Sequence, residues 1–380
     1  MRYDKVRHLG IPLIAILFPS LVSLGMSAAS IPRPRQTVTL TGPEAFDPDV
    51  APDVLMFSPD GKQLLVGGSA LPENRLAPHL SVFDVGTRKR TVRLAGHSAC
   101  VRDVAFSQDG KLMASCGDDN EVRLWDTQKW ELVRRITHQE GGDQLLSVAV
   151  SPDGSLVIAG SNSSFVVAFD AATGRQLWTL DLPKPWNRGQ MVVGLRFAQG
   201  GRLFVAGTDS GRVFVCGIDK GKAKIVKNWS VFPEDSNLQD GIPELERIDL
   251  SPKGDLVAVA AYLSEAAPRK EGYGLSLWEV ATGERIADLG GHRTGTFAVA
   301  FFPDGDLLVS GGKAAEGEKA AGELKVWSVR QKRLLAVQQT LKKYRVWALA
   351  VSPDGSRLAV GNPFEPLVMW RIDTDSGMKK

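Results

Sequence analysis

The sequence has few of the residues that build disulfide frameworks. Its 380 residues include three cysteines, Cys100, Cys116 and Cys216. An odd and small number of cysteines does not make a disulfide framework. We expect Cys100 and Cys116 to lie diagonally on neighbouring strands, which is a poor geometry for a bridge. All three are therefore predicted to be buried or half-buried thiols.

The sequence also lacks an excess of charge of either sign. Its 46 Lys and Arg residues and 43 Asp and Glu residues give a net charge of +3, and the part that follows residue 29 carries only +1. Nucleic-acid binding depends on the neutralisation of phosphates by basic side chains. This balance argues against a nucleic acid as partner. A hydrophobic content of 43% is ordinary for a soluble globular protein.

Charge is absent from one segment near the N-terminus. Residues 11–26 are mostly apolar, follow three basic residues and precede three small ones. This layout is typical of a secretory signal peptide that is cleaved after Ala29. An uncleaved anchor or a buried helix is the alternative, although the apolar run is short for a membrane span. We predict a signal peptide at 1–29, a linker at 30–35 and an exported protein, periplasmic or extracellular, which contacts a membrane only through an uncleaved leader.

What the chain does contain is a repeat. The phrase Ser-Pro-Asp-Gly, intact or blurred, occurs seven times at intervals of 44 to 53 residues. The copies begin at Ser58, Ser107, Ser151, Ala198, Ser251, Phe302 and Ser352. A fixed period of this size is typical of repeat architectures. The sequence therefore predicts seven units within residues 36–374, followed by a C-terminal tail at 375–380.

Each copy is predicted to form four short strands. In the second copy, residues 96–138, apolar or alternating runs are separated by turns rich in Gly, Asp and Asn. Four-stranded units that repeat radially close into one body. The last copy ends after its third strand, and residues 36–41 alternate like a strand, so we expect them to complete the last unit and close the ring. The predicted fold is an all-β, seven-bladed propeller.

The second copy resembles a WD-repeat (WD40). The matching residues are Gly96-His97 at its entry, Ser107-Gln108-Asp109-Gly110, Ser115, Asp119 and Trp125-Asp126 at its close. The resemblance implies a structural hydrogen-bond tetrad of His97, Ser115, Asp119 and Trp125. A satisfied polar chain of this kind rigidifies a thin sheet. The sixth copy keeps His292, Ser310 and Trp327 and loses the Asp.

The resemblance also implies a binding ring at the mouth of the central channel. In this family the residue after the first apolar position of each inner strand commonly contacts peptide ligands. Here these positions are Asp53, Arg102, Leu146, Val193, Glu246, Phe297 and Trp347. Arg102 can form a bidentate pair with a carboxylate, and an exposed Trp and Phe beside it have the composition of an interface hot spot. Alternatively, these side chains only plug the channel.

Long insertions are predicted on the same face, which we call the top face. They occur at Ser69–Leu80, Leu182–Gln190, Phe232–Pro243, Ala261–Gly274 and Gly311–Gly322. Binding residues concentrate on loops held by a rigid scaffold. Surface insertions cost little free energy, however, so drifted and tolerated loops are the alternative.

The motif at residues 168–178 resembles the docking motif of quinoprotein propellers. It occurs once, and the calcium ligands and catalytic carboxylate of such an enzyme have no evident place, so a hairpin turn explains it more simply. The histidines show no spacing typical of a metal site or a triad: His8 lies in the leader, and His79 and His138 lie in a loop and at a junction between repeats.

We therefore predict a non-enzymatic protein-interaction scaffold with no cofactor, no metal and no catalytic residue. It binds a protein or peptide partner on the top face, as a monomeric propeller within a larger complex. An exported propeller enzyme that uses the channel, a quinoprotein-like dehydrogenase or a hydrolase, is the alternative. A structural component of an envelope complex is another.

Overall fold

A computed structural model describes most of the chain. The described ranges are residues 37–46, 52–68, 79–138, 143–184, 190–232, 243–262, 274–314, 321–341, 344–362 and 365–375. They all belong to the unit formed by residues 36–380. The predicted signal peptide at 1–29 and linker at 30–35 lie outside these ranges. In the ranges that the structure covers, no helix is long and apolar enough to cross a membrane.

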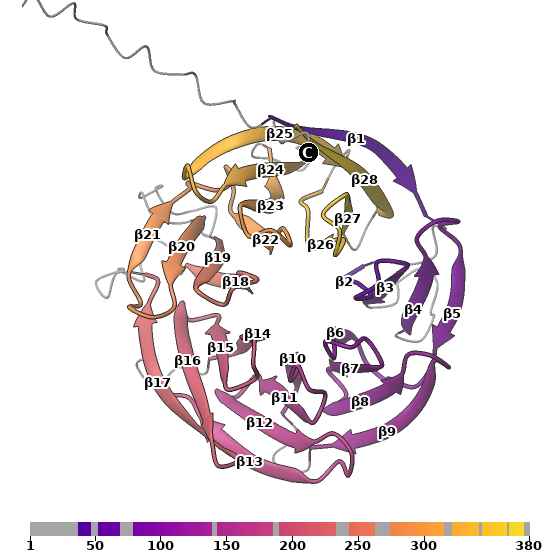
Figure 1. The fold of residues 1–380 in the computed structure, drawn as a ribbon, viewed down its shortest axis with the longest axis vertical. Helices are drawn as coiled ribbons and strands as arrows, with labels where there is room; N and C mark the ends of the chain where they lie inside the picture. Colours follow the sequence, from indigo (N-terminus) through magenta and orange to yellow (C-terminus); the bar gives the residue numbers. More distant parts are fainter. Residues whose placement is uncertain are drawn as a thin grey trace, which may run out of the picture. The chain divides into compact units, whose positions relative to one another are not determined.

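Seven four-stranded antiparallel sheets make up this unit and are arranged radially like blades (Figure 1). Blade one is β2 (Val54–Phe57), β3 (Gln63–Gly68), β4 (His79–Asp84) and β5 (Arg90–Leu94). Blade two is β6 (Val101–Phe106), β7 (Leu112–Gly117), β8 (Glu121–Asp126) and β9 (Glu131–Thr137). Blade three is β10 (Leu145–Val150), β11 (Leu156–Ser161), β12 (Phe165–Asp170) and β13 (Gln176–Asp181). Blade four is β14 (Val192–Phe197), β15 (Leu203–Thr208), β16 (Arg212–Asp219) and β17 (Lys222–Ser230).

The remaining three blades continue in the same order. Blade five is β18 (Glu244–Leu250), β19 (Leu256–Tyr262), β20 (Leu275–Glu279) and β21 (Arg285–Asp288). Blade six is β22 (Thr296–Phe301), β23 (Leu307–Lys313), β24 (Gly322–Ser328) and β25 (Arg333–Leu341). Blade seven is β26 (Ala348–Val351), β27 (Arg357–Asn362), β28 (Glu365–Asp375) and β1 (Thr37–Ala45). The predicted all-β, seven-bladed propeller is confirmed.

Blade seven is made from both ends of the unit. β1 pairs antiparallel with β28, and Val38 lies opposite Thr374. Near the end of β1, Glu44 forms ion pairs with Arg88 of blade one and with Arg371 of β28. β1 is therefore the outer strand of the last blade, although it comes first in the sequence (Figure 1).

The hydrophobic core lies between the blades. Seven clusters of buried apolar residues each join two neighbouring blades. Between blades three and four, for example, Ile158, Leu195, Phe204 and Phe214 are almost completely inaccessible to solvent. Each blade thus buries both of its faces against its neighbours, and apolar burial of this kind is the main favourable term in folding.

The repeated turns form a second set of contacts between blades, which we call the turn ring. An added Cβ on the last glycine of each turn would lie 3.2–3.6 Å from the turn of the preceding blade. The contacts are Gly61 on Pro353, Gly110 on Pro59, Gly154 on Ser107, Gly201 on Pro152, Gly254 on Ala198, Gly305 on Pro252 and Gly355 on Pro303. The motif that predicts the repeat therefore also packs the blades together on the face opposite the top face.

Blade two contains a buried chain of polar side chains. His97 Nε2 lies 2.8 Å from Ser115 Oγ, and His97 Nδ1 lies 2.9 Å from Asp119 Oδ2. The indole N–H of Trp125 donates to Ser115 Oγ at 2.9 Å. These are the four side chains of the predicted tetrad. Because buried polar groups are costly when unpaired, the chain joins two strands of the blade, the turn between them and the segment that enters the blade.

Blade six has an equivalent chain with a different acid. His292 Nε2 lies 2.9 Å from Ser310 Oγ, and the indole N–H of Trp327 donates to the same oxygen at 2.9 Å. Glu323 Oε1 lies 2.9 Å from His292 Nδ1 and so takes the place of the missing Asp. Burial lowers the pKa of His292, against the opposing effect of Glu323. Glu323 sits on β24 rather than in the preceding turn, and its longer side chain reaches the same histidine.

The three cysteines are free thiols. Cys116 and Cys216 are fully buried, and Cys100 is half-buried and donates to Asp53 Oδ2 at 3.3 Å. Burial, and then the nearby Asp53 carboxylate, raise the pKa of Cys100 to about 12. A thiol that holds its proton this strongly is a weak nucleophile at neutral pH.

Candidate partner-binding site

The seven predicted mouth residues, which we call the top-face ring, lie at equivalent places in the backbone. In blades two to six each is the extra residue of a β-bulge where an inner strand begins, and in blades one and seven it directly precedes the inner strand. In blade two, Val101 lies opposite Gly117 and Asp103 lies opposite Cys116, so Arg102 has no opposite residue of its own. A bulge of this kind redirects a side chain and recurs beside functional sites.

The same shift occurs in blades three to six, and blades one and seven have a related backbone hydrogen bond. Pairing skips Leu146, Val193, Glu246 and Phe297 in blades three to six. In blade one the backbone N–H of Asp53 donates to Gly67 O at 2.9 Å, although Val54 is the residue opposite Gly67. In blade seven Trp347 N–H donates to Gly361 O at 3.0 Å, beside the Ala348–Gly361 pair. The seven side chains thus occupy equivalent backbone positions at one mouth.

Burial differs sharply between members of the top-face ring. Arg102 is exposed, and five others are half-buried. Phe297 is only 3% exposed, so the prediction of an exposed Phe is wrong. The cause is its surroundings: its ring lies 5.1 Å from that of Tyr262 and 6.1 Å from that of Trp347, nearly parallel to the latter. Trp347 is therefore the aromatic member that a partner can reach.

Arg102 forms its bidentate pair within the protein itself. Its Nε donates to Asp118 Oδ1 at 2.8 Å, and its Nη2 donates to Asp118 Oδ2 at 2.6 Å. Asp118 follows β7, the strand next to that of Arg102, so the partner is local. The carboxylate that the sequence prediction assigned to a ligand is therefore supplied by the same blade.

Sequence reasoning missed Arg345, two residues before Trp347. Its guanidinium carbon lies 4.1 Å from the centre of the Phe297 ring and 4.6 Å from that of Trp347. Such cation–π contacts contribute about 0.5–2 kcal/mol, depending on how far the cation is desolvated. The available signal was a basic residue close in sequence to an aromatic member of the top-face ring. The sequence pattern does not say which face of the Phe297–Trp347 pair the basic side chain covers.

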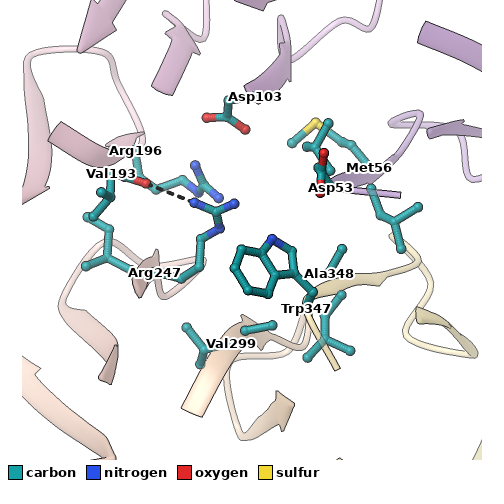
Figure 2. Close-up of a pocket in the computed structure, with 15 residues that line it drawn as sticks. Asp53, Met56, Asp103, Val193, Arg196, Arg247, Val299, Trp347 and Ala348 are labelled. Atoms are coloured by element: carbon teal, nitrogen blue, oxygen red, sulfur yellow. Dashed lines mark hydrogen bonds between the residues drawn. The ribbon is translucent and has the colours of Figure 1, made fainter. Parts of the chain in front are cut away.

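Below the ring, a pocket of about 60 Å³ opens in the channel. Figure 2 shows Arg196, Arg247 and Trp347 pointing into it, with Asp53 and Asp103 on its other walls. Arg247 directly follows the ring residue Glu246 and was also missed by sequence reasoning. The signal was its register, because the residue after the bulge faces the channel.

The carboxylates of the channel hold the blades together. Asp103 accepts the backbone N–H of Val104 at 3.0 Å and of Val148, in the next blade, at 3.1 Å. Asp249 accepts Arg196 Nε at 3.2 Å and the backbone N–H of Phe301, also in the next blade, at 2.8 Å. Burial raises the pKa of Asp103 despite the attraction of Arg196.

The long top-face insertions lie mostly outside the described residues. The link between blades three and four is described at both ends, where a fully buried Gln190 fastens it. Gln190 Nε2 donates to Pro183 O at 2.9 Å, and its Oε1 accepts Ser210 Oγ at 2.9 Å. These bonds anchor the two ends of the link between blades three and four.

The quinoprotein-like motif is a hairpin turn in the structure. Thr173 donates to Asp170 Oδ1 through both its backbone N–H and its hydroxyl at 2.7 Å. Thr87 and Asp84 make the same pair of bonds in blade one. Trp178 stacks on Phe204 of the next blade at 6.2 Å. Over the parts of the chain that are described, no three His, Cys, Asp or Glu side chains gather in a way that could hold a metal.

Fold and site together define a β-propeller with a side-chain ring at one mouth. The WD domain, G-beta repeat family model matches residues 87–126, 130–170 and 283–328. The chain is 30% identical over 153 residues to the COMPASS component SWD3 of Saccharomyces cerevisiae, covering 39% of this chain and 45% of that protein. It is 32% identical over 122 residues to Protein groucho of Drosophila melanogaster, covering 31% of this chain and 15% of that protein. The chain thus carries WD-repeat family repeats within a seven-bladed propeller.

These relatives correct the predicted location. The chain matches less than half the length of each. They are nuclear or chromatin-associated WD-repeat proteins rather than exported ones. The prediction of an exported, periplasmic or extracellular protein is therefore wrong. It depended on residues 1–29 alone, which lie outside the described residues.

Proposed function

We propose that the propeller is a non-enzymatic protein-interaction scaffold that binds a protein or peptide partner at the top-face ring. The observation that carries this proposal is that the seven ring residues occupy equivalent backbone positions, five of them in β-bulges. Equivalent backbone positions present an exposed arginine, half-buried acids, aliphatic side chains and Trp347 at one mouth. A mixture of an aromatic residue with charged and aliphatic neighbours is the usual composition of a binding hot spot.

The rigidity of the ring supports the proposal. The core clusters and turn ring fix the blades before any partner arrives, so little ordering cost is paid on binding. The relative from Saccharomyces cerevisiae is by name a component of COMPASS. We infer that this chain likewise works as a single propeller within a larger protein complex.

The test is affinity capture from cells that produce the protein, with tagged full-length chain as bait. We expect Trp347→Ala and Arg102→Glu to lose the partner that the wild type captures, without a change in the thermal melt. Lys253→Glu is the matched control, because Lys253 is an exposed cation in the turn ring on the opposite face. Undiminished capture by both top-face variants, or loss of capture by Lys253→Glu alone, would show that the partner binds elsewhere.

A further inference from the structure

Four arginines lie at the channel mouth, and within the described residues two of them have no carboxylate partner. Arg102 is paired with Asp118, and Arg196 is paired with Asp249. Among the described residues, no carboxylate oxygen forms an ion pair with the guanidinium of Arg247 or of Arg345. Because two of these arginines have carboxylate partners and two do not, a ligand that binds here could supply the missing carboxylates.

Arg247 has donors to spare. Its hydrogen bonds to described residues are long ones from Nη1 to two backbone carbonyls, Val193 O at 3.5 Å and Glu246 O at 3.4 Å (Figure 2). A guanidinium carries five N–H donors in a planar fork that matches a carboxylate. Arg247 is half-buried and lines the pocket.

The nearby acids do not supply what Arg247 and Arg345 lack. Asp103 and Asp249 are held by the backbone N–H groups and by Arg196, as described above. Glu246 lies close enough to interact electrostatically with both cations, but no ion pair joins it to either of them among the described residues. Burial raises the pKa of Glu246 in spite of both arginines.

Trp347 connects the two arginines. Arg345 lies over one face of its ring, and Arg247 shares the pocket that its indole enters. An apolar surface is thus flanked by two cations. This arrangement complements a segment in which acidic side chains alternate with smaller residues, because each guanidinium can take one carboxylate while the intervening residue packs on Trp347.

We propose that the partner presents an acidic, extended segment to the top-face ring, with one side-chain carboxylate bound by Arg247 and another by Arg345. This inference rests on the proposed function and names the chemistry of the partner. The occupant is a side-chain carboxylate of another protein, rather than a chain terminus.

The test uses a fluorescein-labelled probe of ten residues that alternate glutamate and serine, acetylated and amidated so that its ends are neutral. Binding to the full-length chain is measured by fluorescence anisotropy. The matched probe replaces glutamate by glutamine. We expect the glutamate probe to bind at least tenfold more tightly than the glutamine probe, and to weaken as salt is raised from 0.05 to 0.5 M.

Three variants locate the contact. Arg247→Gln and Arg345→Gln should each weaken binding of the glutamate probe by about tenfold or more, with the thermal melt unchanged. Arg330→Gln removes an exposed charge in the turn between β24 and β25, away from the mouth, and should change binding less than twofold. If all three variants weaken binding equally, the attraction is a general charge effect and the site is wrong.

Other results would also overturn the proposal. These are equal binding of the two probes, no detectable binding of the glutamate probe, or binding only by a probe with a free C-terminal carboxylate. The capture experiment separates this failure from that of the proposed function. If Trp347→Ala loses the captured partner while Arg247→Gln and Arg345→Gln keep it, the scaffold function stands and the acidic partner is wrong.

Discussion

The repeat has a different role at each end of the channel. At one end it packs the blades together, and at the other it presents varied side chains. In the turn ring, each copy presents nearly the same four residues, because the glycine of one turn packs on a side chain in the turn of the preceding blade. In the top-face ring, each copy presents a different side chain from an equivalent position at the start of its inner strand. Sequence is thus repeated where blades touch one another and varied where side chains face the mouth.

The reason lies in what each ring requires of a residue. A turn glycine must adopt a positive φ and leave room for a proline or its equivalent, and almost no other residue does both. A bulge position sets only the backbone, so any side chain is compatible with it. Uniformity therefore indicates a structural constraint, and diversity indicates freedom to specialise.

Opening the ring should have the largest effect, because both faces depend on it. Deleting residues 36–42 removes five of the seven β1 residues that pair with β28 and uncovers the cluster that includes Val38. Lost strand pairing and apolar burial should cost on the order of 5 kcal/mol or more in free energy of unfolding. Thermal melts followed by circular dichroism would measure this.

The control for this deletion keeps the strand and changes only its outer side chains. Thr39 and Thr41 are exposed, and replacing both with alanine should leave the melting temperature close to that of the wild type. If the deletion proved as harmless as this double substitution, closure by β1 would not hold the ring together.

We expect substitutions in the turn ring to cause an intermediate loss of stability. One turn contains two adjacent glycines that can be compared with each other. Gly200 and Gly201 have φ values of 88° and 69°, but an added Cβ meets nothing within 4 Å at Gly200 and lies 3.2 Å from Pro152 at Gly201. Both alanine variants should lose about 1–2 kcal/mol from left-handed strain. Gly201→Ala should lose more, because Pro152 must also move.

Chemical denaturation would measure both variants. An equal loss of stability would mean that the turns do not pack the blades together, and that the motif repeats for the sake of its hairpin alone. A larger loss for Gly200→Ala would also contradict the packing argument.

The smallest effect is expected at the top-face ring. Arg102→Ala breaks the pair with Asp118, whose arginine is 43% exposed. Exposed ion pairs contribute about 0–1 kcal/mol, so the free energy of unfolding should fall by less than about 1 kcal/mol. A loss of stability as large as that of Gly201→Ala would show that the top-face ring also stabilises the fold. The difference between the two faces would then not hold.

Sequence reasoning predicted most of the fold and part of the site. The period and the turn residues predict seven four-stranded units, because hairpins and strand alternation are local properties. The partners of His97 follow from a local pattern too. The role of Glu323 does not follow from such a pattern. Glu323 lies on β24 rather than in the preceding turn, and its longer side chain brings its carboxylate to His292. The burial of Phe297 depends on Tyr262 and Trp347, which come from two neighbouring blades.

Closure by β1 also has a consequence for the order of synthesis. Thr37 pairs with Asp375, so the strand that leaves the ribosome first binds the strand that leaves it last. At about 5–20 residues per second, β1 waits for on the order of a minute or less before its partner exists. During that time blades one to six can assemble in sequence, while the seventh cannot. The growing chain is thus an open arc whose two ends become one blade only when translation reaches β28.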